Sequence, residues 1–452
     1  MTQSNTEQTF HFRQEEIERV FSHVQAGESV SVIGVSGVGK SNFFNHLLDP
    51  NIQKHFLGKE ENQYLLICIN FHYLPDFSIR SVFSLFLDQL MLLEDKKEYH
   101  DIDEKIFEQI EHYHNLLINA ENDLLKVQYY FTLALRKLLQ NSQRRLVFLF
   151  DQFEGLFEAA ESRLFRMLRG FREMYKYRLM YITFTRHDLF ELAIYDDDRE
   201  EFYELLSTNI IGLKPYNERD AVDMINRITK RNQFILPDKS SDKLVVLSGG
   251  HAGLLRAILF AVSSNYDILT NNIEELAQGL VENNNSIIEC TKIWKSITVE
   301  EQKAIAALSH EADLQTVDAS IQNLQLKGLL IGESKKEIFS LVFQIFIQNQ
   351  EDVFEKSLFF DKLTRRVWIF GNPMQSLTMQ EFRLFSCLYE HLDQAVGKDE
   401  LINAVWPEAK GNVSDETLAS AIYRLRKKIE PDPENLRFIH SEREYGYRLT
   451  SE

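Results

Sequence analysis

Along the first part of the chain, hydrophobic and polar positions follow two different periods, which predicts helices alternating with buried strands. Apolar residues recur at helical spacing in residues 15–24, 42–48, 82–90 and 106–113. Between these helices lie four short and almost continuous apolar runs, at residues 29–33, 64–70, 146–150 and 180–184. Such runs fit the strands of a parallel sheet that is covered on both faces. The pattern therefore predicts an α/β domain.

Beyond Pro215 the pattern is helical to about residue 285, and Asn217 with an acidic first turn marks the helix start. Residues 293–346 then predict two helices and a hairpin through residues 338–342. A further unit follows, with strands at 358–361 and 366–369, helices at 377–389, 398–406 and 415–429, and a hairpin at 437–449. Thr378 and Glu381 have the spacing of a capping box. We predict four domains, with bounds at 1–213, 214–287, 288–350 and 355–452.

Composition agrees with a globular protein of several domains. The 452 residues are 44% hydrophobic and 26% charged, close to the average for globular chains. Three distant cysteines without CxxC spacing argue against a disulfide framework or a zinc knuckle. No apolar run approaches the ~20 residues of a membrane span, and the N-terminus lacks the regions of a signal peptide. We expect a soluble cytoplasmic protein with no membrane partner.

The formal net charge of −18 argues against a protein that coats nucleic acid over its whole surface. Residues 355–452 hold 14 basic and 16 acidic residues, whereas the rest of the chain holds 36 and 52. Nucleic-acid contact is therefore expected to be local and to involve the C-terminal domain.

One motif carries clear chemistry. Residues 34–41, Gly-Val-Ser-Gly-Val-Gly-Lys-Ser, fit the phosphate-loop pattern G-x-x-x-x-G-K-[ST] and lie between a predicted strand and a predicted helix. Gly34, Gly37 and Gly39 let backbone N–H groups converge on phosphate oxygens at the helix N-terminus. Lys40 is expected to reach the β- and γ-phosphates, and the Ser41 hydroxyl to ligate Mg²⁺.

Two later strand ends supply partners for this loop. The apolar run at 146–150 ends in Asp151, an acid suited to hold Mg²⁺ of a bound ATP. The run at 180–184 is followed by Thr185 and Arg186, and Arg186 is expected to meet a γ-phosphate. A core strand with a capping Asp, and an ordinary surface arginine, are the alternative interpretations of these residues.

Together with these motifs, several segments in the same order resemble the STAND NTPases, which are signal-transduction relatives of the AAA+ ATPases. The segments lie at 10–16, 151–157, 185–186, 213–215 and 248–255, and the resemblance covers residues 8–347. It implies a phosphate-loop NTPase core with a parallel sheet, a helical lid and a winged helix that relays the nucleotide state. It also implies that Arg13 lies near the adenine and that His251, in the lid turn, faces the nucleotide.

The chain departs from the family pattern at Phe12, where Gly is usual, and at Ala252, where Pro is usual. Gln152 follows Asp151, where most AAA+ motors have a water-polarising Glu. This leaves Glu154 as the candidate general base, with Asp151 and Arg186 as the other candidate catalytic residues. Slow hydrolysis or a nucleotide-held switch is therefore expected rather than a fast motor.

The last domain resembles the DNA-binding domain of response regulators of the OmpR/PhoB type. The resemblance spans residues 358–449 and includes the segments 401–406, 413–418, 422–429 and 443–449. It implies a winged helix whose third helix enters the major groove of duplex DNA. The candidate DNA-binding residues on one face of that helix are Thr417, Ser420, Tyr423, Arg424 and Lys427. Arg426 of the same helix and Arg443 of the hairpin are the further basic candidates. A winged helix used for protein contacts is the alternative.

The sequence thus predicts an ATP-binding, Mg²⁺-dependent switch that regulates transcription by sequence-specific binding of double-stranded DNA. Self-association in the ATP state is expected, and the signal that acts on the switch is unknown. The rival interpretation is a DNA-loading AAA+ ATPase of the origin-initiator or plasmid-partner type.

Overall fold

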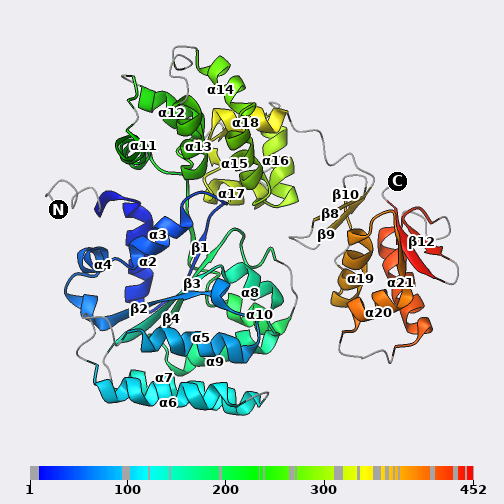
Figure 1. Ribbon diagram of the computed structural model, residues 1–452, viewed down its shortest axis with the longest axis horizontal. Coiled ribbons are helices and arrows are strands. Elements are labelled where there is room, and N and C mark those ends of the chain that lie inside the picture. Colours follow the sequence, from blue (N-terminus) through cyan, green and yellow to red (C-terminus); the bar gives the residue numbers. More distant parts are fainter. Residues whose placement is uncertain are drawn as a thin grey trace. The chain divides into compact units, whose positions relative to one another are not determined.

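The computed structural model divides into two compact units, Met1–Gln348 and Asn349–Glu452 (Figure 1). It describes residues 10–93, 102–120, 123–141, 144–192, 196–233, 235–237, 240–263, 269, 272–309, 319–332, 336–349, 358–361, 366–369, 372–374, 377–407, 413–430, 436–442 and 445–450. Many buried residues of the first unit, from Ile17 to Ile347, belong to one hydrophobic core. The predicted bounds between core, lid and small winged helix stay predictions.

A five-stranded parallel sheet lies at the centre of the first unit, with the strand order β2-β3-β4-β1-β5. Its strands are β1 (Val30–Ile33), β2 (Tyr64–Asn70), β3 (Arg145–Asp151), β4 (Leu179–Thr185) and β5 (Ile210–Gly212). The four strands predicted from apolar runs are confirmed to within one residue. Strand β5 is not predicted, because its three residues are too few to give a pattern. The carboxyl ends of parallel strands meet at one edge, where ligands bind in such sheets.

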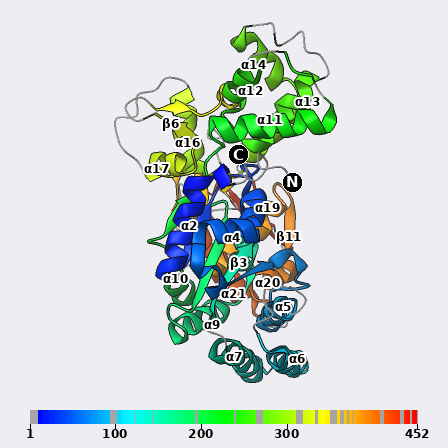
Figure 2. The same ribbon diagram turned by 90° about the vertical axis from the view of Figure 1, so that its left-hand side faces the viewer.

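Helices surround this sheet (Figures 1 and 2). They are α2 (Gln14–Ala26), α3 (Lys40–Leu47), α4 (Pro50–Leu57), α5 (Ile79–Met91), α6 (Glu104–Ile118), α7 (Leu124–Asn141), α8 (Phe153–Ala159), α9 (Ser162–Met174) and α10 (Asp197–Tyr203), with short 3₁₀ turns at Gly58–Gln63 and Phe71–Tyr73. Alternate residues of a strand point to opposite faces. In β3, Val147 and Leu149 join the core that α2 and α3 share, whereas Phe148 and Phe150 pack on Phe86 of α5.

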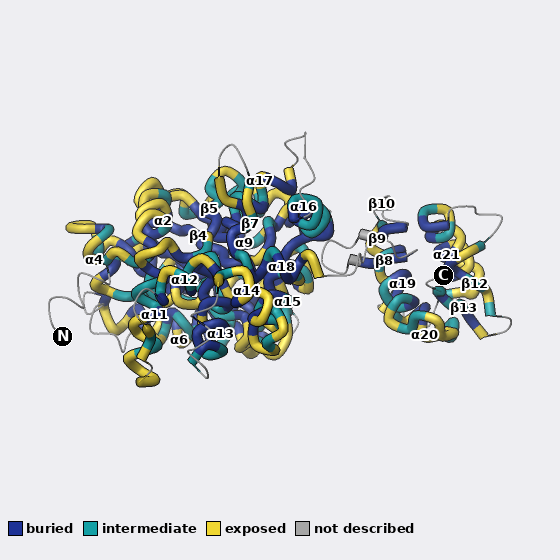
Figure 3. Tube along the Cα trace, turned by 90° about the horizontal axis from the view of Figure 1, so that it is seen from above, coloured by how far each residue is buried: buried dark blue, intermediate teal, exposed yellow. Residues whose placement is uncertain are grey.

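A helical segment follows the sheet, with α11 (Glu218–Asn232), α12 (Ser240–Ser248), α13 (Ala252–Ser263), α14 (Ile273–Val281) and α15 (Asn284–Trp294). The small winged helix comprises α16 (Val299–Ser309), α17 (Ala319–Leu326), β6 (Leu330–Ile331), β7 (Glu337–Ile338) and α18 (Leu341–Gln348). The hairpin predicted through residue 342 ends at Ile338, and Val342 lies in α18. The reason is a helix start at Ser340, whose Oγ accepts the N–H of Phe343. Figure 3 shows α18 mostly in the colour of buried residues.

The second unit is a winged helix with a sheet at each end. Strands β8 (Leu358–Asp361), β9 (Arg366–Ile369) and β10 (Asn372–Pro373) form one antiparallel sheet. Strands β11 (Ala395–Gly397), β12 (Ile439–Glu442) and β13 (Gly446–Leu449) form the other. Between them lie α19 (Met379–Glu390), α20 (Lys398–Val405) and α21 (Asp415–Ile429) around one core. The capping box of Thr378 and Glu381 is confirmed.

Close approach of backbone fixes one turn of this unit. A side chain at Gly446 would place its Cβ 1.9 Å from the Val396 carbonyl oxygen, so only glycine fits between β11 and β13.

No helix within the described ranges is both long enough and apolar enough to span a bilayer.

Candidate nucleotide site and DNA-binding helix

The loop between β1 and α3 contains the glycines of the predicted phosphate loop. Gly37 and Gly39 have φ angles of 80° and 105°, which only glycine adopts readily. Gly34 is enclosed by Val38 and Leu213, and its N–H donates to the Thr185 carbonyl at the end of β4. The loop leads into the N-terminus of α3, where unpaired N–H groups favour an anion.

Lys40 lies in the first turn of α3, with Nζ donating to the carbonyl oxygens of Gly34 and Val35. The pKa of Lys40 is lowered to about 8, mainly because its side chain is buried; the positive charge of Arg186 also lowers it, whereas the carboxylates of Glu154 and Asp151 raise it. A bound phosphate would further favour the charged form, because an anion stabilises a protonated amine. Ser41 follows with an exposed side chain. Lys40 and Ser41 are therefore available to a phosphate and its metal ion.

Asp151 ends β3 beside Asn70, which ends the neighbouring β2. Its Oδ2 accepts a hydrogen bond from Asn70 Nδ2 at 3.2 Å, and its Oδ1 accepts the N–H of Gln152. Burial raises the pKa of Asp151, and the nearby Lys40 charge lowers it. A divalent cation would compensate the charge of this half-buried carboxylate.

Glu154, in the first turn of α8, is buried and faces the end of β4. Its Oε2 accepts Arg186 Nε at 2.6 Å, and its Oε1 accepts the backbone N–H groups of Arg186 and His187. Both carboxylate oxygens are therefore engaged by the strand end. The predicted role of Glu154 as a general base requires this ion pair to open, so it stays a prediction.

His251, in the turn between α12 and α13, contacts the outer side of the phosphate loop. Its ring is fully buried, and Nε2 lies 2.9 Å from the Ser36 carbonyl oxygen. Nδ1 accepts the N–H of Leu254, so the ring is neutral with its proton on Nε2. Burial lowers the pKa of His251 to about 4, while the bond to Ser36 raises it.

Three residues near this loop are missed by sequence reasoning. Ser296 Oγ accepts the N–H of Ser36, and Tyr216 approaches Gly39 and Asn42 through its hydroxyl group. Glu289 Oε2 would lie 3.1 Å from a Cβ on Gly37. Tyr216 directly follows the predicted junction at 213–215, and this position in the sequence could have indicated its place near the loop. Glu289 lies in α15 and Ser296 in the turn that follows it, and neither position belongs to a sequence motif.

Arg13 joins the phosphate loop to the start of the helical segment. Its guanidinium donates to the carbonyl oxygens of Val38 and Lys214 at 2.8 Å and lies 4.6 Å from the centre of the Tyr216 ring. Its backbone N–H donates to Asp220 of α11. Beside it is a cavity of about 470 Å³, lined by the start of α2, residues 214–217 and the start of α11. The predicted position of Arg13 near the adenine of a nucleotide stays a prediction.

Behind Arg186, a buried polar network joins the sheet to the small winged helix. Lys327, after α17, pairs with Glu301 of α16 at 2.6 Å, and both side chains are at most 2% exposed. Glu191 lies 3.9 Å from Lys327 and accepts a hydrogen bond from Asn323. Burial raises the pKa of Glu191 and lowers that of His187, whose Nδ1 lies 3.9 Å from Glu191 Oε2. No sequence motif indicates this network.

In the second unit, α21 presents the predicted DNA-binding face. The predicted residues Thr417, Ser420, Tyr423, Arg424 and Lys427 are all exposed, and the residues Leu418, Ile422, Leu425 and Ile429 of the same helix are buried. Arg426 differs, because its guanidinium donates to the Ile439 carbonyl oxygen and to Ser441 Oγ of β12. Arg426 thus holds the hairpin against the helix. Arg443 lies outside the described residues.

Two family models match the chain. Residues 2–278 match the model described as Novel STAND NTPase 1, and residues 371–449 match that of the C-terminal domain of transcriptional regulatory proteins. Among solved structures, the Walker-type ATPase PABY2304 of Pyrococcus abyssi is similar at 16% identity and a TM-score of 0.46, over 74% of this chain and 95% of that chain.

Two further solved structures are similar to parts of the chain. The Klebsiella pneumoniae RstA DNA-binding domain, solved in complex with the RstA box, matches at 26% identity and a TM-score of 0.19, over 21% of this chain and 93% of that chain. The Aeropyrum pernix ORC2 protein matches at 13% identity and a TM-score of 0.39, over 76% of this chain and 93% of that chain.

The two matches divide the protein into an NTPase part and a DNA-binding part. The parallel five-stranded sheet carries the phosphate loop, and the second unit is a winged helix of the OmpR/PhoB type. The NTPase model covers more than half of the sequence. The chain therefore belongs to the novel STAND NTPase 1 family.

Proposed function

We propose that this protein is an ATP-dependent switch that regulates transcription, in which the nucleotide state controls sequence-specific binding of double-stranded DNA by α21. One observation carries the proposal. The phosphate loop is bonded on its outer side to His251 of the helical segment and to Ser296 of the segment that follows α15. A change in the loop on binding phosphate would alter these contacts directly.

The residues at the loop fit ATP and Mg²⁺. An anion is favoured by the left-handed backbone of Gly37 and Gly39, by the half-buried Lys40 and by the helix N-terminus. Mg²⁺ prefers oxygen ligands, which the exposed Ser41 and the Asp151 carboxylate offer. Lys40 would hold the phosphates, and Ser41 and Asp151 would hold the metal ion. The magnesium ion would neutralise phosphate charge, and Arg186 would approach the terminal phosphate once released from Glu154.

The contacts of the loop support a closed state that nucleotide opens. Gly250 packs directly against the backbone of Tyr216. A Cβ on Gly250 would lie 2.1 Å from the Tyr216 carbonyl oxygen, so this contact requires glycine. Pro215 and the Gly249–Gly250 turn are the proposed hinges. Opening of these hinges would free surfaces for self-association in the ATP state, and clustered DNA-binding units would bind with higher avidity.

The decisive experiment measures DNA binding as a function of nucleotide. A duplex selected from random sequences by the full-length protein is titrated, by fluorescence anisotropy, with the wild type in its apo, ADP and ATP-analogue states. We expect affinity to differ by at least about tenfold between the ADP and ATP-analogue states, and Lys40→Ala to abolish the difference. Equal affinity in all states would contradict the switch.

Two parallel measurements separate the remaining alternatives. Light scattering of the same samples tests self-association, and a single mass in every nucleotide state would contradict it. Steady-state hydrolysis with and without DNA tests the rival function, because a DNA-loading ATPase shows DNA-stimulated turnover. The proposed function requires the protein to work in the compartment that contains the DNA, as expected from the sequence for a cytoplasmic regulator.

A further inference from the structure

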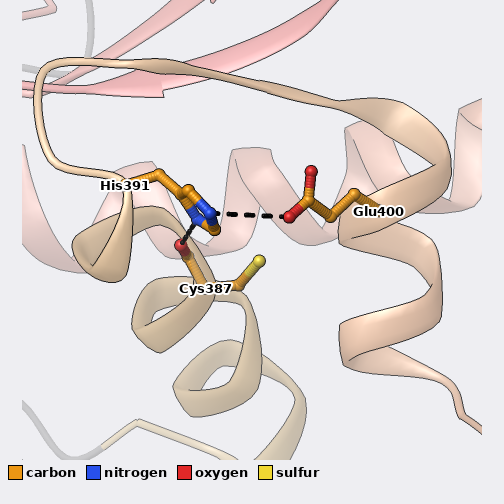
Figure 4. A group of neighbouring side chains, drawn as sticks. All are labelled: Cys387, His391 and Glu400. Atoms are coloured by element: carbon orange, nitrogen blue, oxygen red, sulfur yellow. Dashed lines mark hydrogen bonds and ion pairs between the residues drawn. The ribbon is translucent and has the colours of Figure 1, made fainter.

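A cluster of three metal-ligating side chains lies in the second unit, away from the DNA-binding face. Cys387 is in the last turns of α19, His391 directly follows that helix, and Glu400 is in the first turn of α20 (Figure 4). One ligand atom from each residue lies within 4.8 Å of the others. The loop through β11 and the packing of α20 on α19 bring the three residues together.

The hydrogen bonding of His391 leaves its Nε2 atom facing the Glu400 carboxylate. Nδ1 lies 3.0 Å from the Cys387 carbonyl oxygen, and a carbonyl oxygen only accepts, so Nδ1 carries the proton. In the neutral ring, Nε2 then has a lone pair, and it lies 3.6 Å from Glu400 Oε1. A bond from Nδ1–H to a backbone carbonyl is the arrangement that orients imidazole for a metal ion on Nε2.

The charges around the thiol favour a cation. The charged groups that act on Cys387 are the carboxylates of Glu400 and Glu390. Figure 4 shows the sulfur, the imidazole and the Glu400 carboxylate directed toward a shared space between the helices. Thiolate, imidazole and carboxylate together are ligands of Zn²⁺ and related divalent transition metals rather than of Mg²⁺ or Ca²⁺.

We propose that Cys387, His391 and Glu400 form a binding site for a divalent transition-metal ion of the Zn²⁺ class. Ligand atoms around one tetrahedral zinc ion lie about 3.5 Å apart, so the widest pair must close by about 1 Å. Glu400 and His391 are 55% and 41% exposed and can rotate to do so. The fourth position stays open to water or an added ligand, which is typical of sites that exchange their ligand.

The bound ion would tie the end of α19 to the start of α20. Both helices share one hydrophobic core with α21, through residues such as Leu388, Leu401 and Leu425. The ion would therefore stabilise the scaffold that presents the DNA-binding face. This site is independent of the phosphate loop, so the inference does not depend on the proposed nucleotide switch.

Metal binding by the full-length chain, purified without a histidine tag and freed of metal, tests the site. Equilibrium dialysis against Zn²⁺ is followed by elemental analysis. We expect about one ion per chain, lost in Cys387→Ser and in His391→Ala, and retained in the controls Cys68→Ser and His440→Ala. Equal metal content in the wild type and the two ligand variants would overturn the proposal.

Two further readouts keep the test independent of folding defects. With Co²⁺, the wild type should show thiolate-to-cobalt charge-transfer absorption that Cys387→Ser lacks. Glu400→Gln changes an exposed side chain and should fold normally by circular dichroism, yet weaken Zn²⁺ binding by about tenfold or more. No charge-transfer band in the wild type, or an unchanged Zn²⁺ affinity in Glu400→Gln, would contradict the assigned ligands.

Discussion

The carboxylate of Glu154 lies 2.6 Å from Nε of Arg186 and also accepts the backbone N–H groups of residues 186 and 187. The two side chains predicted to act separately on a nucleotide are thus joined in one ion pair. Glu154 is 8% and Arg186 47% exposed, so the pair lies at the boundary between the protein interior and the site. Release of Arg186 toward phosphate and release of Glu154 toward water are therefore coupled.

This coupling predicts non-additive kinetics. Glu154→Gln should abolish turnover while sparing ATP binding if Glu154 is the base, and Arg186→Ala should slow turnover by removing a charge from the phosphate. Because the two side chains act as a unit, the double variant should be no slower than the slower single variant. Steady-state hydrolysis assays measure this. Equal turnover in wild type and Glu154→Gln would exclude Glu154 as the base.

The second prediction concerns nucleotide affinity. Lys40→Ala should weaken ATP binding at least about tenfold, because each charge-assisted phosphate contact contributes ~1.5–3 kcal/mol. Isothermal titration calorimetry checks this, with Lys54→Ala as the control, since Lys54 is exposed on α4. Unchanged affinity in Lys40→Ala would remove the basis of the assigned phosphate site.

The third prediction concerns pH. The folded-state pKa of His251 is about 4, below the ordinary value of 6.5, so the unfolded chain binds more protons between these values. Its contribution to stability is complete above pH 6.5 and is lost as the pH falls toward 4, by up to about 3 kcal/mol. Urea unfolding at several pH values should show a smaller acid-induced loss in His251→Asn than in the wild type. The same pH dependence of the free energy of unfolding in both proteins would contradict this prediction.

The fourth prediction concerns the buried pair of Lys327 and Glu301. Lys327→Met leaves the Glu301 carboxylate buried without its cation and should destabilise the first unit by about 3–5 kcal/mol. Adding Glu301→Gln should recover much of this loss, since the amide oxygen can still accept the N–H of Thr298. Chemical denaturation measures the free energy of unfolding of the single and the double variant. Lys126→Met, which breaks an exposed pair with Asp123, serves as the control and should leave the free energy of unfolding nearly unchanged.

The fifth prediction concerns DNA. Arg424→Ala should cost ~1–3 kcal/mol and relax preference at one base pair, whereas Lys427→Ala should lower binding evenly and reduce the salt slope by about one unit. Arg426→Ala should instead lower the melting temperature, because it removes the bonds from α21 to β12. Selection from random duplexes and salt titrations measure these effects. Recovery of no enriched sequence would make the second unit a protein-interaction module.

Much of this protein follows from local sequence. Continuous apolar runs determine β1 to β4, because strands buried on both faces need apolar residues at every position. The phosphate loop is recognisable because left-handed backbone at Gly37 and Gly39 requires glycine next to a helix start. The capping box at Thr378 and the alternation of exposed and buried residues in α21 are equally local, since their partners lie within one or two turns.

Other features depend on residues that are distant in the sequence. Ser296 accepts a hydrogen bond from Ser36, which lies 260 positions away in the sequence. Lys327 pairs with Glu301 of another helix, and Arg426 donates to the hairpin instead of lying on the DNA-binding face. Cys387, His391 and Glu400 meet only because α20 packs on α19. The sequence alone determined the elements and the phosphate loop, because periodicity and backbone strain act over a few residues. Tertiary structure alone decided which polar side chains are buried together, because burial and pairing depend on how distant elements pack.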